Sequence, residues 1–259
     1  MQLRNDRFYA LVSLLAFFLI SPNFRRSCVM AEQTKFWYLN HFNLFEGMDE
    51  SAMMELDRMS SMSEVKQHQP IYFPDEPSHS IFLLKKGHVK ISRLSPEGKE
   101  VILEVIGPGE VFGELSLLEA GSQRSEMAQA LDDVVICAVK QDDFERLMMK
   151  NPELNFRVTK RIGLRMKKFE ERVSDLVFKD VRKRLASFLV GYAEEFGKVK
   201  RGIVTIKMHL SHQEIAFLTG SARQTVTTTL NEFRTSGLID FSREGITIKQ
   251  FDKLQQMAK

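Results

Sequence analysis

Apolar residues follow different periods along this chain of 259 residues, and the changes of period divide it into regions. Between residues 36 and 62 they recur at three- and four-residue spacings, which predicts helix. Between residues 71 and 139 they fall in short β-prone runs: 71–73, 81–84, 89–91, 101–105, 111–112, 127–130 and 134–139. Turns rich in Pro and Gly separate these runs, so they predict a small antiparallel barrel or roll. Helical spacing returns at Gln141.

A long helix is predicted after Asn151-Pro152, because Pro is tolerated in a first helical turn and only Gly163 interrupts the residues that follow. Its apolar residues alternate spacings of four and three, the pattern of a coiled-coil seam. The seam consists of Ile162, Met166, Phe169, Val173 and Leu176. A stripe this narrow between charged flanks favours pairing with an identical helix over packing on the chain's own sheet. The sequence therefore predicts a homodimer.

Two short helices joined by a glycine are predicted near the C-terminal end. Ser211-His212-Gln213-Glu214 has the form of a capping box, and so has Ser221-Ala222-Arg223-Gln224. Gly220 suits the left-handed residue that ends the first of these helices. Two capped helices joined in this way are the skeleton of a helix-turn-helix.

The second of these helices has one apolar face, formed by Val226, Leu230 and Phe233. The opposite face, with Asn231 on it, carries amide, hydroxyl and guanidinium groups but no carboxylate, and such groups pair with base edges and phosphates. Runs 238–241 and 246–248 predict a β-hairpin, the wing of a winged helix, which places Arg243 near phosphate. The predicted DNA contacts are Ser211, Gln213, Ser221, Arg223, Gln224, Thr227, Thr228 and Arg243.

The charge distribution supports a nucleic-acid partner. The formal net charge is +3, but residues 182–259 hold 13 Lys and Arg against 7 Asp and Glu. A basic C-terminal third behind a mildly acidic front is typical of a nucleic-acid-binding tail domain. Cys28 and Cys137 provide neither a disulfide framework nor metal-ligand spacing, which indicates a reducing compartment. The sequence offers no nucleophile–base pair, metal cluster or P-loop, so we predict no catalytic residue, no metal site and no enzyme.

The N-terminal region contains an apolar run, FYALVSLLAFFLI at residues 8–20, which follows Arg4 and Arg7. It resembles the core of a signal peptide and is too short for an ordinary membrane span. Three interpretations compete: a start codon assigned upstream of Met30, a membrane tether, or a packed extra helix. Because a DNA-binding protein fits poorly behind a secretion signal, we expect a cytoplasmic protein without a membrane partner.

A candidate ligand pocket lies in the second half of the predicted roll. Glu114 and Arg124 occur in an apolar segment punctuated by glycines. A buried guanidinium needs an anion, and a carboxylate can accept hydrogen bonds from a sugar hydroxyl. The alternative is a salt bridge between Glu114 and Arg124 inside an empty pocket.

The order of roll, long helix and winged helix resembles the family of the cyclic-AMP receptor protein and the fumarate–nitrate reduction regulator, the Crp/Fnr family. The resemblance covers roughly residues 39–253, and its most specific parts are Lys86-Gly87 and residues 96–100, 109–125 and 213–239. It implies an α+β fold: an antiparallel β-roll like a cyclic-nucleotide-binding jelly roll, a long dimerisation helix and a C-terminal winged helix-turn-helix. The implied regions are an N-terminal extension (1–30), the effector-sensing roll (36–150), the dimerisation helix and hinge (151–180) and the DNA-binding domain (181–259).

The resemblance also implies roles for the pocket residues. Gly113-Glu114-Leu115 would begin a phosphate-binding cassette in which Glu114 accepts from a ribose hydroxyl, and Arg124-Ser125 would hold a cyclic phosphate. Phe169 would take the position on the dimer helix that contacts the base, and because it is also a seam residue two roles are open: stacking on the base or filling the core. The implied effector is cyclic AMP or another cyclic nucleotide.

Departures from the family pattern leave the effector open. Glu126 follows Arg124-Ser125 where a small residue is usual, and Phe169-Glu170 replace a Thr-Ser pair. In an extended strand Glu126 would point away from Ser125 and be harmless, whereas turned inward it would place a carboxylate near the phosphate. A different small effector, or none, is the alternative. A cyclic-nucleotide-binding module of an enzyme or channel is a more distant alternative that the winged helix disfavours.

The DNA site should also differ from that of the family's receptor. An Arg-Glu-x-x-x-Arg pattern becomes Arg223-Gln224 with Thr228 at the last position, so a two-fold palindrome of different sequence is expected. The expected partners are double-stranded DNA, a second copy of the chain and a small effector, and activation would imply RNA polymerase. Effector binding is expected to shift the dimer helices and reorient the recognition helices.

Overall fold

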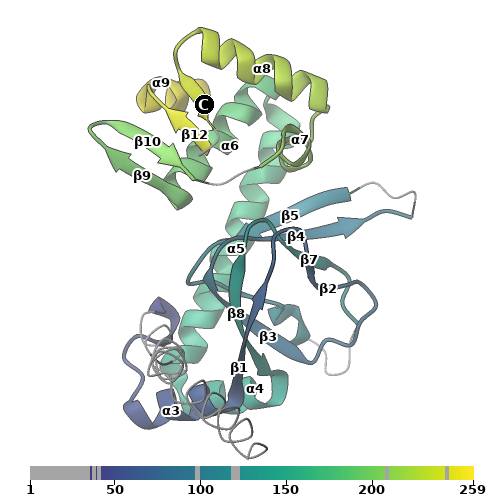
Figure 1. Ribbon diagram of the computed structural model, residues 1–259, viewed down its shortest axis with the longest axis vertical. Helices are drawn as coiled ribbons and strands as arrows, with labels where there is room; N and C mark the ends of the chain where they lie inside the picture. The colour runs from purple at the N-terminus through teal and green to yellow at the C-terminus, as the bar shows by residue number, and fades with distance from the viewer. Residues whose placement is uncertain are drawn as a thin grey trace, which may run out of the picture.

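Two lobes joined by one long helix make up the described part of the chain (Figure 1). The computed structural model describes residues 36, 39, 42–96, 100–117, 123–207, 210–242 and 245–259, without the side chains of Leu115 and Ser116. The apolar run 8–20, the three interpretations of it and the predicted DNA contact Arg243 lie outside these residues. No helix within the described ranges is long and apolar enough to cross a membrane.

The first lobe begins with a short helical segment and then enters a sheet. The 3-10 helix η1 (Asn43–Phe45) precedes α3 (Glu50–Met59), whose N-cap Asp49 accepts a hydrogen bond from the Ala52 N–H at 2.7 Å. The predicted helix to residue 62 is wrong at its end, because β1 (Ser60–Val65) starts at Ser60. These residues pair along their whole length with β8 (Val134–Lys140), a long-range contact that outweighs the local spacing.

The first lobe is a roll of two four-stranded antiparallel sheets, in the strand orders β1-β8-β3-β6 and β2-β7-β4-β5. The remaining strands are β2 (Pro70–Tyr72), β3 (Ser80–Lys86), β4 (Val89–Leu94), β5 (Glu100–Ile106), β6 (Val111–Phe112) and β7 (Met127–Ala130). Every predicted run of the roll therefore forms a strand, and the jelly-roll-like fold is confirmed. Strand β1 was not predicted.

The rings of Tyr72, Phe82 and Phe112 stack inside the roll, with centroids 5.7 Å apart for Tyr72–Phe82 and 5.1 Å for Phe82–Phe112. This stack belongs to the core and also forms the floor on which the candidate ligand residues lie. The helix α4 (Gln141–Lys150) closes one end of the roll with buried Phe144 and Leu147.

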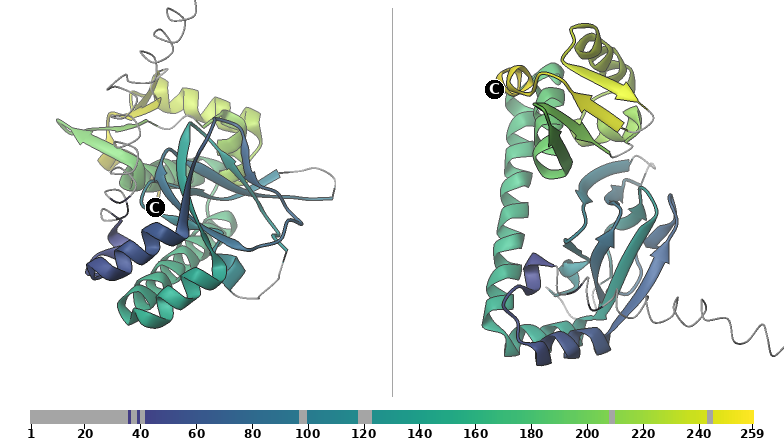
Figure 2. Two further views of the ribbon diagram at one scale, coloured as in Figure 1. Left: turned by 60° about the horizontal axis from the view of Figure 1, so that its bottom comes forward. Right: turned by 60° about the vertical axis from the view of Figure 1, so that its left-hand side comes forward.

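The long helix is α5 (Pro152–Phe178), with Pro152 in its first turn as predicted. Figure 2 shows it running beside the roll and up to the second lobe. Only Leu154 and Val158 are buried along its length. Apolar packing therefore fixes the start of α5, and the rest of the helix must be held by other contacts.

The second lobe is a winged helix. It consists of α6 (Val181–Phe196), β9 (Gly197–Lys200), β10 (Ile203–Ile206), α7 (His212–Thr219), α8 (Arg223–Thr235), β11 (Ile239–Ser242), β12 (Gly245–Ile248) and α9 (Phe251–Met257). The strands form one antiparallel sheet in the order β11-β12-β10-β9. The predicted hairpin of β11 and β12 is confirmed. The hairpin of β9 and β10 was not predicted, because its exposed Lys and Arg residues resemble a loop.

The two lobes contact one another directly. Ile102, Val105 and Leu131 of the roll belong to the same apolar cluster as the core of the second lobe. The buried Lys90 on β4 forms ion pairs with Glu100 at 2.8 Å and with Glu214 of α7 at 3.7 Å. Helix α7 therefore lies against the sheet of the roll.

Candidate functional site

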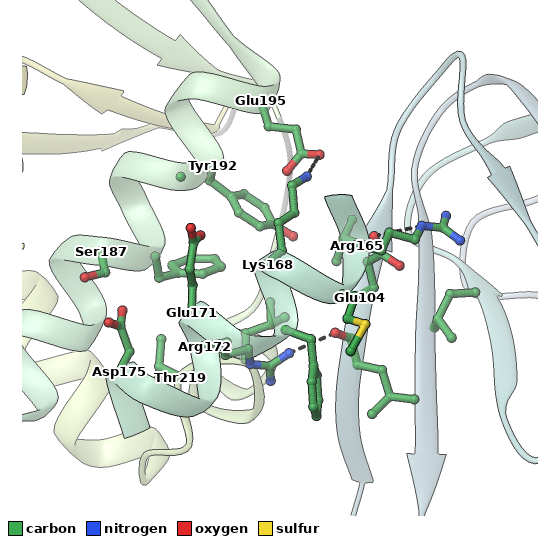
Figure 3. A pocket seen from close by; sticks show the side chains of 18 of the residues that line it. Glu104, Arg165, Lys168, Glu171, Arg172, Asp175, Ser187, Tyr192, Glu195 and Thr219 are labelled. Atoms are coloured by element: carbon green, nitrogen blue, oxygen red, sulfur yellow. Dashed lines mark hydrogen bonds and ion pairs between the residues drawn. The ribbon is translucent and has the colours of Figure 1, made fainter. Parts of the chain in front are cut away.

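A cavity of about 830 Å³ lies where the roll, α5 and the second lobe meet (Figure 3). Its walls come from β5, the segment 112–114 and Glu126 of the roll, from one side of α5, and from α6 with the end of α7. Anything bound in the cavity can therefore touch the roll, the long helix and the helix-turn-helix at the same time.

Arg124 lies beside this cavity as a buried cation. Its guanidinium carbon is 3.9 Å from the centre of the Tyr72 ring, and Nη2 donates a hydrogen bond to the Ser80 carbonyl at 2.7 Å. Gly113 has φ +77°, and a Cβ there would lie 3.0 Å from Arg124 Nη1, so glycine allows both the turn and the approach of the guanidinium. Within the described ranges no carboxylate oxygen lies within 4.0 Å of Arg124. Such a cation is costly unless an anion arrives.

Glu114 is paired with α5 and not with Arg124. Arg165 Nη1 donates to Glu114, and Arg165 Nε lies 3.2 Å from Glu104 of β5. The internal Glu114–Arg124 salt bridge considered from the sequence is therefore absent from the described contacts. Burial raises the pKa of Glu104 to about 7, although the charge of Arg165 opposes this shift. Figure 3 shows Glu104 and Arg165 side by side at the cavity wall.

Ser125 and Glu126 face opposite sides of the chain. The exposed Ser125 hydroxyl accepts a hydrogen bond from Arg93 Nη2 at 2.8 Å, on the outside of the roll. Glu126 points inward, is only 7% exposed and accepts a hydrogen bond from the Tyr72 hydroxyl at 3.1 Å. Burial raises the pKa of Glu126, and the charge of Glu114 adds to the shift. The inward orientation, with its carboxylate near the candidate phosphate position, is the one that the structure shows.

The remaining predicted pocket residues are placed as follows. Phe169 lines the cavity from α5 and is largely exposed. Gly113 and Glu114 line it from the roll, whereas the Leu115 side chain lies outside the described part. The side chains of Arg124 and Ser125, predicted to hold one phosphate together, point to opposite sides of the chain.

A row of arginines on α5 was missed by the sequence reasoning. Arg161 donates to the Gly109 carbonyl at 2.9 Å and pairs with Glu110 at 3.2 Å. Arg172 donates to the carbonyls of Leu103 at 2.9 Å, Ile102 at 2.8 Å and Phe217 at 3.2 Å. With Arg157 and Arg165 these side chains recur every four or seven residues, so they share one helix face. That spacing could have indicated an arginine face that docks on the roll, but it was not used because charged residues along a helix usually face solvent.

The predicted seam lies next to these arginines on α5, and four of its residues line the same cavity. Ile162, Met166, Phe169, Val173 and Leu176 are between 44% and 64% exposed, which is unusual for apolar residues at regular spacing. At its upper end the seam reaches the second lobe: a Cβ at Gly220 would lie 2.4 Å from Leu176 Cδ2.

The first capping box of the helix-turn-helix is confirmed. The Ser211 N–H donates to Glu214 Oε2 at 2.8 Å, the Glu214 N–H donates to Ser211 Oγ at 3.2 Å, and Gly220 ends α7 at φ +59°. The second box is wrong, since Ala222 is the N-cap of α8 and makes no side-chain cap. Ser221 instead completes the end of α7: its N–H donates to the Ala216 carbonyl at 2.9 Å, and its hydroxyl donates to that of Thr219 at 3.2 Å.

The two faces of α8 separate as the sequence indicated. Val226, Leu230 and Phe233 are buried, whereas Arg223, Gln224, Thr228 and Asn231 are exposed. Helix α8 lies on the side of the second lobe away from the roll (Figure 1). Thr227 is half-buried: its hydroxyl donates to the Arg223 carbonyl at 2.9 Å and lies 2.9 Å from His212 Nδ1. Ser211 is exposed, while Gln213 and Ser221 are half-buried at the same end of the lobe.

The Glu104→Gln substitution should remove part of the pH dependence of stability. Because the folded-state pKa of Glu104 is raised to about 7, the folded protein binds more protons, and stability is lost as pH rises from about 4.5 through about 7. The variant should lack this loss, of the order of 3 kcal/mol at most. Urea denaturation at several pH values measures it. An unchanged slope in the variant would contradict the assignment, and Glu126 should leave a residual slope of the same sign.

Comparisons with known proteins agree with the site. The cyclic nucleotide-binding domain matches residues 62–151, and the Crp-like helix-turn-helix domain matches residues 183–257. A global nitrogen regulator of Nostoc sp. is 33% identical over 184 residues, 71% of this chain and 82% of that protein. A CRP-like cAMP-activated global transcriptional regulator of Mycobacterium tuberculosis is 27% identical over 216 residues, 83% of this chain and 96% of that protein.

Solved structures show the same architecture. A mutant of CooA from Carboxydothermus hydrogenoformans matches with a TM-score of 0.66 at 25% identity, over 83% of this chain and 92% of that one. FixK2 from Bradyrhizobium japonicum matches in fold with a TM-score of 0.67 at 21% identity, over 77% of this chain and 98% of that one. The relatives are transcription regulators, so the predicted class is confirmed. With a roll that carries a cassette-like pocket, a long helix and a winged helix, this chain belongs to the Crp/Fnr family of DNA-binding transcription regulators.

Proposed function

We propose that this chain acts in the cytoplasm as a homodimer whose pocket takes a small anionic effector and whose α8 helices read a palindromic operator. The proposed regions are the roll (36–150), the dimer helix and hinge (151–180) and the DNA-binding domain (181–259). The observation that carries the proposal is the buried guanidinium of Arg124, which has no carboxylate partner among the described residues and lies beside a cavity lined by all three regions. Activation by such a dimer would add RNA polymerase as a partner.

Cyclic AMP is the first effector to test. The Mycobacterium tuberculosis relative is a cAMP-activated regulator, and Gly113, Glu114 and Arg124 match the cassette positions of the family here. Two observations favour the alternative, a different anion or no effector: Glu114 is already paired with Arg165, and the Glu126 carboxylate points into the pocket.

The cavity suggests how an effector would act on DNA binding. Arg172 and Lys168 line it, and both hold neighbouring elements: Arg172 binds the Phe217 carbonyl of α7, and Lys168 pairs with Glu195 of α6 at 2.6 Å. An anion in the cavity competes for these cations. Its binding would therefore shift the population between two arrangements of the second lobe.

Calorimetry with cyclic AMP and cyclic GMP tests the effector. Wild type should bind one of them, and Arg124→Ala should lose about 10- to 100-fold in affinity, because a charge-assisted hydrogen bond is worth about 1.5–3 kcal/mol. Arg93→Ala is the matched control, since Arg93 of β4 binds the neighbouring Ser125 on the outside of the roll. Absence of heat with wild type would remove the cyclic-nucleotide hypothesis.

The reading face of α8 is tested by Arg223→Ala. Loss of its guanidinium should weaken binding to a site selected from random DNA by about 1–3 kcal/mol, as measured by fluorescence anisotropy. Arg234→Ala removes the same charge at the far end of α8, where Arg234 pairs with Asp240, and should leave affinity nearly unchanged. Equal losses of affinity for both variants would show that DNA binding depends on the positive charge of α8 and not on a contact made by Arg223.

The seam of α5 is tested by placing a charge in it. Val173→Asp should shift the protein from dimer to monomer in sedimentation velocity, because an unpaired carboxylate in an apolar interface is strongly destabilising. Phe156→Asp is the control, since Phe156 is 70% exposed but lies outside the seam. A dimer that persists with Val173→Asp would mean that another surface joins the subunits.

A further inference from the structure

We propose that Glu126 is a specificity-determining residue of the effector site, which admits an anion at Arg124 only together with a proton taken up by Glu126. This inference rests on the proposed binding of an anion by Arg124. The ligand class is then an anion with an oxygen that accepts a hydrogen bond from a carboxylic acid, and not any anion that fits the cavity.

One aromatic ring fixes the relative positions of the two groups. The Arg124 guanidinium lies over the face of Tyr72 at 3.9 Å, and the hydroxyl of the same Tyr72 donates to Glu126 at 3.1 Å. Stacking on Phe82 and Phe112 holds that ring in place. Glu126 is therefore a fixed part of the cavity wall, near Arg124 but not within 4.0 Å of it.

Within the described residues, Arg124 and Glu126 form no ion pair with the charged groups around them. The groups that act on Glu126 are Tyr72 from β2, Arg93 from β4, Glu114 from η2 (Glu114–Leu117) and Arg124. Glu104 of β5 and Arg165 of α5 line the same cavity. Arg165 holds Glu104 and Glu114, and Arg93 binds Ser125 on the outside. No cation is left over among these groups for an ionised Glu126 once an anion occupies Arg124.

The state of Glu126 then decides whether an anion is accepted. An ionised carboxylate this close to a second negative charge in a buried site repels it strongly. A protonated carboxyl group has one O–H donor, which it can direct to an oxygen of the anion. Burial already favours the protonated form, because it raises the pKa of this side chain.

The test uses cyclic AMP as the probe in titration calorimetry of the full chain at pH values from about 6 to about 8. Wild-type affinity should fall with rising pH by up to about tenfold per unit, the limit for uptake of one proton. Glu126→Gln should bind with no such slope and, at about pH 8, at least about tenfold more tightly than wild type, since the amide always donates. Buffers of different ionisation enthalpy should show proton uptake by wild type and none by Glu126→Gln.

Glu104→Gln is the matched control, because Glu104 also has a raised pKa and lines the same cavity. It should keep the slope. Glu126→Ala only removes the carboxylate and should also lose the dependence of affinity on pH. It replaces Glu126→Gln as the test if the amide disturbs folding.

Several results would overturn the inference: a slope that survives Glu126→Gln, a slope that disappears in Glu104→Gln, or no gain in affinity at high pH. Failure of both Glu126 variants to bind cyclic AMP at every pH would also do so, because removal of the carboxylate should suffice to admit a cyclic phosphate. If wild type binds independently of Arg124, the proposed function fails. If Arg124 is needed but the slope is absent, only the role of Glu126 fails.

Discussion

The way α5 is attached to the roll constrains the rest of the structure. Beyond Val158 the helix is held by guanidinium groups on carbonyls and carboxylates of the roll, through Arg161, Arg165 and Arg172. A guanidinium offers several N–H donors in a rigid plane, so each side chain can satisfy more than one buried acceptor. The apolar side chains of the seam are thereby not needed to dock α5, which explains why they stay exposed on a helix that is firmly attached. A helix docked through its apolar face could not offer that seam to a second subunit.

The same arginines set the electrostatics of the pocket. Arg165 pairs with both Glu104 and Glu114, so the carboxylate expected to meet a ribose is already paired with a side chain of α5. Arg124 is in the opposite situation: within the described residues its buried charge contacts a carbonyl and two aromatic rings but no carboxylate. The pocket therefore differs from a simple cassette in two places, and both differences involve charges that a ligand must displace or satisfy.

Local patterns in the sequence predicted most elements of the fold, since the other strands of the roll, the long helix and the two helices of the helix-turn-helix all depend on short-range spacing. The predictions failed where a distant partner decides. Pairing with β8 turned Ser60–Val65 into a strand, and the end of α7 took Ser221 out of its capping role. In the candidate site, Gly113 and Arg124 do lie together, but the partner of Glu114 comes from 51 residues away. The inward orientation of the Glu126 side chain was one of two alternatives that the sequence left open, because the twist of one short strand decides it.

The contact between Leu176 and Gly220 joins the seam of α5 to the turn between α7 and α8. In the proposed dimer, a rotation of α5 against its partner helix would therefore be passed to the helix-turn-helix by direct contact as well as through the hinge peptide. In a dimer, the separation of the two α8 helices would depend on the size of the side chains at positions 176 and 220, which lie between α5 and the helix-turn-helix. Changes in bulk there would then retune the half-site spacing of the operator without altering any residue that touches a base.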